Sequence, residues 1–220
     1  MRNSRWRDWL FGGQGRPLAA FLAAASLFIP PPLGAYHRHL SEDDVREAYL
    51  FGQRRGLSVG KFFDAYEKRF TYTANEPSVR AIGVRSPYAA VVLRSHQGGN
   101  TYSAQQAWKD YTERARVFEV VIWIDIPFRS PVPQNRAFDP AVGIQQMFTV
   151  ELNSQEQVLA SQKALLMPQY FPGGDFSTLS GAEMHIEYDV QSVASDTARI
   201  QVTSKAGKTV TADFDLAALR

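Results

Sequence analysis

The second half of the chain carries the hydrophobic pattern of β-strands. Residues 117–126 are almost continuously apolar and β-branched, which is expected of a central strand buried on both faces. Apolar and polar residues then alternate with a period of two over 183–190, 198–203 and 210–216, and Gly207 lies in the turn between the last two segments. This pattern predicts a mostly antiparallel β-sheet or a β-sandwich-like layer.

The first half of the chain shows helical periodicity. Three segments that follow Ser41, Ser58 and Ser103 place apolar residues on one helical face. Ser41 and Ser103, together with the residues that follow them, fit helix N-caps. Segments 79–85 and 88–95, which lie between the second and third of these, are predicted to be strands. The expected fold class is therefore α+β, with N-terminal helices followed by the sheet.

The first 35 residues have the pattern of a secretory signal peptide. A head with several arginines precedes an apolar run at 18–29, and three prolines follow at 30–32. The run has twelve residues, whereas about 20 are needed to cross the hydrocarbon core of a membrane. We expect cleavage after Ala35 and a periplasmic or secreted protein, and the alternative is an uncleaved membrane anchor.

Composition beyond the leader indicates a unit that needs no covalent cross-links. Residues 1–35 hold four arginines and one aspartate, so the net charge of +2 for the whole chain becomes −1 without them. A near-neutral domain argues against nucleic-acid binding, which needs a basic face. The absence of cysteine excludes thiol nucleophiles and thiolate metal sites. Residues 36–220 suit a single α+β domain, and a division into 36–116 (helix-rich) and 117–220 (β-rich) is the alternative.

Two histidines lie directly after the expected cleavage point. His37 and His39, with Asp43 and Asp44 nearby, are candidate ligands for a divalent metal. Arg38 separates the two imidazoles, and chain termini are usually solvated, so we expect neither a bound metal nor a cofactor.

His185 is the main candidate for catalysis. If 183–190 is a strand, Glu183, His185, Glu187 and Asp189 lie on one face. These four residues spread over about 20 Å, so a second strand has to bring any further histidine or carboxylate to within about 4 Å of the imidazole. An imidazole paired with a carboxylate can supply a general acid and base. The alternative is a solvated polar face on a half-exposed sheet.

Two carboxylates also share a face of the central strand. Glu119 and Asp125 lie six residues apart, about 20 Å along a strand, so they do not form a glycosidase pair by themselves. Carboxylates in an apolar strand are the type of group that acid catalysis uses, which makes Asp125 a further candidate. The alternative is that the two residues mark strand ends that reach solvent or an arginine.

The candidate binding site is the aromatic segment 170–176, which is predicted to be a loop. It carries Tyr170, Phe171 and Phe176 around two glycines. Exposed aromatic rings stack on sugars or anchor a protein partner. The alternative is that these rings close the end of the core.

These patterns leave three possible functions. The sequence has no H-E-x-x-H, Walker or EF-hand pattern that would favour one of the three. We expect an exported envelope or extracellular protein of a binding or structural kind. Its partner would be an envelope protein or a glycan, with no nucleic acid and with a membrane only through residues 1–35. The first alternative is a secreted hydrolase, metal- or acid/base-dependent, centred on His185 with Glu183 or Glu187. The second is a membrane-tethered assembly factor, which requires an uncleaved leader.

Overall fold

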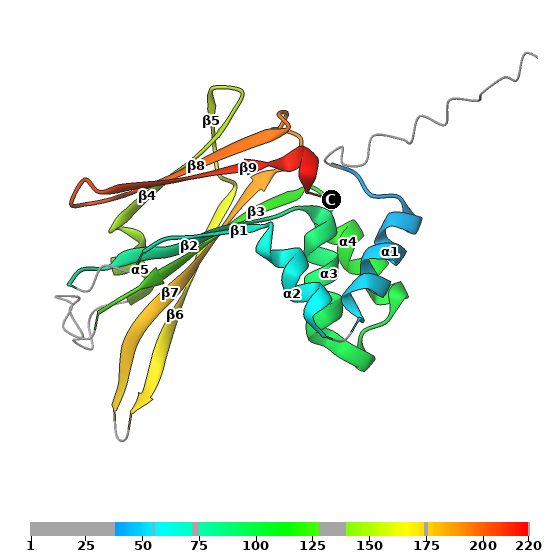
Figure 1. Cartoon of the computed structure of the whole chain (residues 1–220), viewed down its shortest axis with the longest axis horizontal. Helices are drawn as coiled ribbons and strands as arrows, with labels where there is room; N and C mark the ends of the chain where they lie inside the picture. The colour runs from blue at the N-terminus through cyan, green and yellow to red at the C-terminus, as the bar shows by residue number, and fades with distance from the viewer. Residues whose placement is uncertain (1–37, 55, 72–74, 128–139, 174–175, 220) are drawn as a thin grey trace, which may run out of the picture. The chain divides into compact units, whose positions relative to one another are not determined.

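The computed structural model describes residues 38–54, 56–71, 75–127, 140–173 and 176–219 (Figure 1). All of them belong to one compact unit, Pro32–Arg220. The helices among them are α1 (Glu42–Gly52), α2 (Leu57–Asp64), α3 (Pro87–Gly98), α4 (Ala104–Arg114) and α5 (Pro140–Gln145), with 3-10 turns η1 (Gly99–Thr101) and η2 (Leu216–Ala218).

The strands form two antiparallel sheets. The five-stranded sheet has the order β1-β2-β3-β7-β6, and the four-stranded sheet has the order β5-β4-β8-β9. The strands of the first sheet are β1 (Glu67–Arg69), β2 (Ser78–Arg85), β3 (Val117–Asp125), β7 (Phe176–Asp189) and β6 (Lys163–Gly173). Those of the second are β5 (Gln157–Leu159), β4 (Phe148–Ser154), β8 (Thr197–Ser204) and β9 (Thr209–Asp215).

The two sheets stack face to face as a β-sandwich (Figure 1). One face of β3, which carries Phe118, Val120 and Ile122, is fully buried and joins Ile200 and Phe214 of the other sheet in one core cluster. β3 is the middle strand of five, so the prediction of a central strand is confirmed, as is the α+β fold class. The expected burial of both faces is not complete, because Glu119 and Trp123 on the other face keep intermediate exposure.

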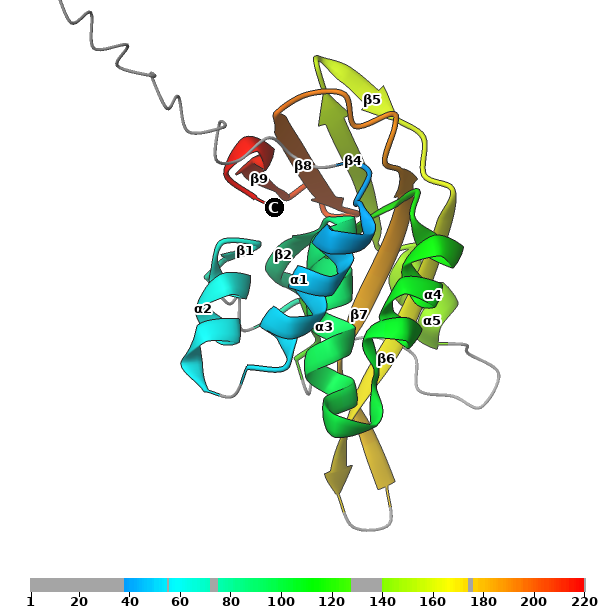
Figure 2. The same ribbon diagram turned by 90° about the vertical axis from the view of Figure 1, so that its right-hand side faces the viewer.

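The helices form a second core on the other face of the five-stranded sheet. Helices α1, α3 and α4 pack on one another and bury Val45, Ala48 and Val92 completely or almost so. Figure 2 shows this group of helices in front of β6 and β7. Phe62 and Phe63 of α2 contact both cores, and so they join the helices to the sandwich.

The two predicted N-caps are present. The Ser41 hydroxyl accepts from the Asp44 N–H while the Asp44 carboxylate accepts from the Ser41 N–H, which completes a capping box at the start of α1. At the start of α4, the Ser103 hydroxyl accepts from the Gln106 N–H at 3.1 Å. These caps satisfy N–H groups that the first helical turn leaves without partners.

The prediction of a strand at 88–95 is wrong, because these residues belong to α3. The Ser86 hydroxyl accepts from the Ala89 N–H, and Pro87 occupies the first turn, where its missing N–H costs nothing. Val91 and Val92 suggested a strand, but both are buried in the helical core. Tertiary packing therefore outweighs the weak local preference of β-branched residues.

No helix in the described part of the chain is long and apolar enough to span a membrane.

The close approach of β3 and β7 predicts a sharp difference between two glycine substitutions. A Cβ at Gly181 would lie 2.5 Å from the carbonyl oxygen of Ile124, whereas a Cβ at Gly60 in α2 meets nothing within 4 Å. Gly181→Ala should lower the free energy of unfolding by about 1–3 kcal/mol because backbone must move. Gly60→Ala should raise it by up to about 1 kcal/mol through higher helix propensity. Urea unfolding of both variants measures this, and equal stability of the two would contradict the described strand spacing.

Candidate functional site

The polar residues of the five-stranded sheet lie in rows on the face that the helices cover in part. One row crosses four strands in register: Arg85 of β2, Glu119 of β3, Glu187 of β7 and Lys163 of β6. Because neighbouring strands lie about 4.8 Å apart, residues in one row are close enough to interact. The opposite face of the same strands is the apolar sandwich core.

A pocket of about 290 Å³ lies between this face and helices α3 and α4. Strands β2, β3, β6 and β7 form its floor, and apolar side chains contribute to its wall. The apolar residues include Val91 and Leu93 of α3 and Leu165 and Met167 of β6. Leu165 and Met167 are 50% and 42% exposed, so the β6 side of the pocket offers apolar surface to a ligand.

Three ion pairs line the pocket, and each joins an arginine to a carboxylate. In every pair the carboxylate is the more buried partner: the acidic side chains are 16–22% exposed and the arginines 21–43%. The arginine side chains are therefore the more exposed partners, clearly so for Arg94 and Arg114 and only slightly for Arg85. The pairs are Arg85–Glu119 at 3.0 Å, Arg94–Asp110 at 3.4 Å and Arg114–Glu187 at 2.5 Å.

His185 lies on the pocket floor and is held by a carboxylate from the adjacent strand. Its Nδ1–H donates to Glu119 Oε1 at 3.0 Å. Its Nε2 is 3.4 Å from Glu183 Oε2, which is within ion-pair range, but the two atoms form no hydrogen bond. This nitrogen has less than 1 Å² of exposed surface. Glu183 itself accepts from the Gln169 amide at 2.8 Å. The imidazole is thus fixed between two carboxylates.

The electrostatics of Glu119 follow from its two partners. Burial alone would raise the pKa of the carboxyl group. The hydrogen bond from His185 and the charge of Arg85 outweigh burial and hold the pKa of Glu119 below its ordinary value. Glu119 is therefore ionised at neutral pH and accepts from His185 and Arg85 at the same time.

The structure brings together some of the residues that the sequence singled out. His185 and Glu187 both line the pocket, and Glu119 is the group that a second strand brings within 4 Å of the imidazole. Asp125 lies at the other end of β3, where its carboxylate is 3.5 Å from Arg80. It is not part of this pocket.

The candidate metal ligands and the aromatic segment lie elsewhere. His37 is outside the described residues, and Nε2 of His39 accepts from the Gln191 amide at 2.7 Å. Within the described residues, no three histidine or carboxylate side chains are arranged to hold a metal ion. Tyr170 and Phe171 belong to strand β6 rather than to a loop, and they are 48% and 67% exposed. Phe176 begins β7, and its side chain is outside the described part.

The chain also contains a G-x-S-x-G segment, 56–60, which is the pattern around the nucleophile of α/β-hydrolases. In those enzymes the serine follows a strand and points at a histidine. Here Gly56 caps α2, α1 is the preceding element, and Ser58 is exposed. No hydrogen bond found in the described part joins Ser58 to a histidine, so this segment does not form a nucleophile site.

Sequence reasoning missed the basic side of the pocket. Arg85 ends an apolar strand, Arg114 lies in the last turn of a helix, and Lys163 begins an edge strand. A basic residue at the end of an apolar segment is the signal that they share. Their common location depends on the strand order and on the packing of α4, which no local pattern contains.

No protein-family model matches this chain, and no curated protein sequence matches it significantly.

The lowered pKa of Glu119 predicts how its contribution to stability depends on pH. At pH 7, Glu119→Gln should reduce the free energy of unfolding by about 2 kcal/mol, because one of the two charge-assisted hydrogen bonds loses its acceptor and the other loses the negative charge. A carboxyl group with a lowered folded pKa stabilises the fold above its ordinary value of 4.5 and loses this effect as pH falls through the folded value. The difference between wild type and Glu119→Gln should therefore shrink below about pH 4.5.

Urea unfolding of both proteins between pH 7 and pH 3 measures this difference. Glu113→Gln is the matched control, because Glu113 is exposed on α4. It should change stability by no more than about 0.5 kcal/mol at any pH. A Glu119→Gln effect that stays constant down to pH 3 would contradict the pairing of Glu119 with His185 and Arg85.

Proposed function

We propose that this protein is an exported, non-enzymatic binding protein, and that the pocket between the five-stranded sheet and α3/α4 holds a small organic anion. The anion is a carboxylate or a phosphate, carried by an envelope glycan, a protein or a free molecule. The observation that carries the proposal is the exposure of the arginines in the ion pairs. In each pair the arginine side chain is more exposed than its carboxylate, so the side-chain surface available to a ligand is mainly cationic.

The side chains of the pocket suit a ligand with one charged end and one apolar part. Arg94 and Arg114 each use part of a five-donor guanidinium in an ion pair, and the remaining donors suit a carboxylate or phosphate. Lys163 also lines the pocket and makes no ion pair with the described residues. Leu165 and Met167 would contact the apolar part of the ligand.

The sequence supports export. The basic head, the short apolar run at 18–29 and the prolines that follow match a signal peptide better than a membrane span. The alternative of a membrane-tethered assembly factor depends on residues 1–35, which lie outside the described residues. An exported protein without cysteine has to rely on its core, and the two core clusters are consistent with that requirement.

A second candidate function is acid/base-dependent hydrolysis centred on His185. It is favoured by the 3.0 Å hydrogen bond from His185 Nδ1 to Glu119, because a carboxylate that orients an imidazole is common to many general bases. In this reaction Nε2 would take a proton from water as the water attacks the substrate. However, Nε2 is buried and faces Glu183, so a substrate or water reaches it only if the Glu183 side chain moves. Binding is therefore the better-supported function.

A pair of lysine variants tests the binding proposal. Titration calorimetry with glucuronate, hexanoate and phenyl phosphate should detect binding of at least one anion by the purified protein. Lys163→Ala should weaken that binding about five-fold, because one exposed charge contributes about 1 kcal/mol. Lys205→Ala, which removes an exposed lysine from the β8–β9 turn, should leave it unchanged. An affinity that changes neither with salt concentration nor with Lys163→Ala would count against the proposal.

A hydrolase assay tests the second candidate. Ester, phosphate-ester and glycoside substrates should be turned over by wild type and not by His185→Gln if the imidazole is the general base. Glu183→Gln should keep or raise the rate, since it weakens the group that blocks Nε2. If no substrate in the panel is hydrolysed, or if His185→Gln retains the wild-type rate, the hydrolase assignment fails and the binding proposal is untouched.

A further inference from the structure

A second pocket lies on the same face of the five-stranded sheet, beyond the helices. It has a volume of about 410 Å³ and is lined by Trp123 of β3, Glu67 and Arg69 of β1, and Arg80 of β2. The pocket described above does not include these residues, and the proposed binding of an anion does not use them.

Trp123 forms an aromatic platform in this second pocket. A Cβ at Gly83 would lie 2.8 Å from Cζ3 and 3.0 Å from Cη2 of the indole, so the six-membered ring lies directly over Gly83 of β2. Only a residue without a side chain allows this close approach. The ring spreads across the neighbouring strand and remains partly exposed, as one face of a stacking site requires.

The polar groups around Trp123 are balanced in charge. Arg69 pairs with Glu67 at 2.7 Å, and Arg80 lies 3.5 Å from Asp125. Glu67, Arg69 and Arg80 line the pocket with the indole, and Asp125 adjoins it through its ion pair with Arg80. All four are planar groups with several donors or acceptors. This set suits a neutral ligand that is rich in hydroxyl groups, which needs donors and acceptors but no net charge.

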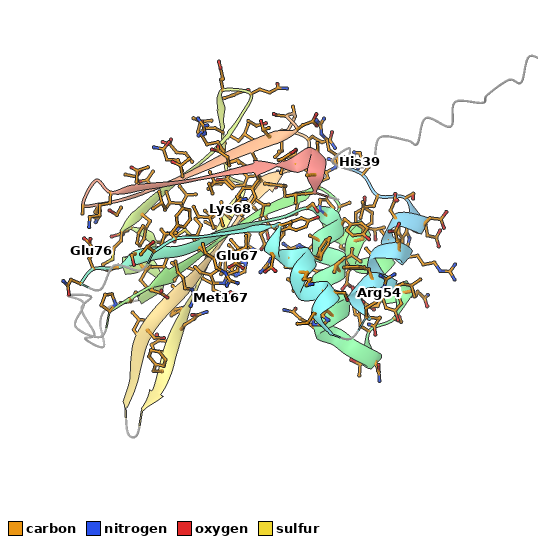
Figure 3. All side chains as sticks on the ribbon, viewed as in Figure 1. His39, Arg54, Glu67, Lys68, Glu76 and Met167 are labelled. Atoms are coloured by element: carbon orange, nitrogen blue, oxygen red, sulfur yellow. The ribbon has the colours of Figure 1, made fainter. Side chains whose placement is uncertain are left out.

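One row of residues across the sheet joins the two pockets. Met167, which lines the first pocket, lies opposite Glu183, and Glu183 lies opposite Trp123 of the second pocket. Two strand spacings separate Met167 from Trp123, or about 10 Å. Figure 3 labels one residue from each pocket, Glu67 and Met167, on the same side of the sheet. One ligand of modest length can therefore reach both pockets.

We propose that the two pockets are subsites of one groove that binds a short acidic oligosaccharide. The acidic ring occupies the pocket beside α3 and α4, where Arg94, Arg114 and Lys163 take its carboxylate. A neutral ring stacks on Trp123, with its hydroxyls bound by the Arg69–Glu67 and Arg80–Asp125 groups. The assignment rests on the proposed anion binding for the first subsite and adds the ligand class and the second subsite.

The face of the sheet favours a saccharide over a peptide. Peptides that bind sheets pair with the backbone of an edge strand, whereas a sheet face offers only side chains. A saccharide has no backbone amides to satisfy. It presents hydroxyls that planar charged side chains can bind from the side, and an apolar C–H face that an indole can cover.

Three probes test the proposal by titration calorimetry on the purified protein: glucuronic acid, aldotriouronic acid with one acidic and two neutral rings, and neutral xylotriose. We expect aldotriouronic acid to bind at least about ten-fold more tightly than glucuronic acid, because it fills both subsites. Xylotriose should bind more weakly than aldotriouronic acid, because it lacks the carboxylate. Aldotriouronic acid should also shift the indole N–H resonance of Trp123 in NMR spectra, whereas glucuronic acid should not.

Variants separate the two subsites. Trp123→Ala should weaken aldotriouronic acid about ten-fold and leave glucuronic acid unchanged. Trp108→Ala is the matched control, because it removes the same type of side chain from α4. Arg69→Ala is a second test of the subsite. It does not disturb packing, because the Arg69 side chain is 75% exposed. Arg69→Ala should weaken aldotriouronic acid but not glucuronic acid.

Several outcomes would overturn the proposal. Equal affinity for glucuronic and aldotriouronic acid, or no effect of Trp123→Ala and Arg69→Ala, removes the second subsite and leaves the anion-binding function standing. Binding of hexanoate or phenyl phosphate but of neither sugar acid removes the saccharide assignment alone. If none of the anions binds, the anion-binding function fails and the groove fails with it.

Discussion

The burial of one whole face of strand β3 is the constraint on which the rest of the molecule depends. Its alternate residues, Phe118, Val120 and Ile122, pack into the sandwich, so Glu119 and Trp123 have to lie on the opposite face. That face needs its own cover. Helices α3 and α4 supply it at one end of the sheet, and the pocket is the space they leave over the polar row.

Burying a charged row under helices is unfavourable unless each charge has a partner, and the partly buried members of the row meet this condition, while Lys163 is exposed. Glu119 accepts from both Arg85 and His185, and Glu187 accepts from Arg114 of α4. The contact between Arg114 and Glu187 joins α4 to the sheet through polar groups, in addition to the apolar contacts of Phe62 and Phe63. The paired groups are therefore held in place without a ligand, which would lower the entropy lost on binding the proposed anion.

The periodicity of the sequence predicts several of the strands, but it does not predict which strands lie side by side. The period of two predicted that Glu183, His185 and Glu187 share a face, and the register of β7 agrees with this. The same pattern does not predict the contact between His185 and Glu119, because that contact depends on which strand lies beside β7 and in which register. The misassigned segment 88–95 has the same cause. Val91 and Val92 fit a strand locally, and only the cap at Ser86 and the packing on α1 determine a helix.

The position of the histidine bears on the choice between a binding surface and a catalytic one. A general base needs a free nitrogen that faces its substrate, but Nε2 of His185 faces Glu183 and has almost no exposed surface. The imidazole instead spans two strands, since it bonds Glu119 on β3 while its own backbone lies in β7. In this conformation it holds one carboxylate oxygen of Glu119, and the other oxygen accepts from Arg85. The groups that remain accessible include arginines, a lysine, an indole and apolar side chains, which are of kinds that can bind a ligand without exchanging protons with it.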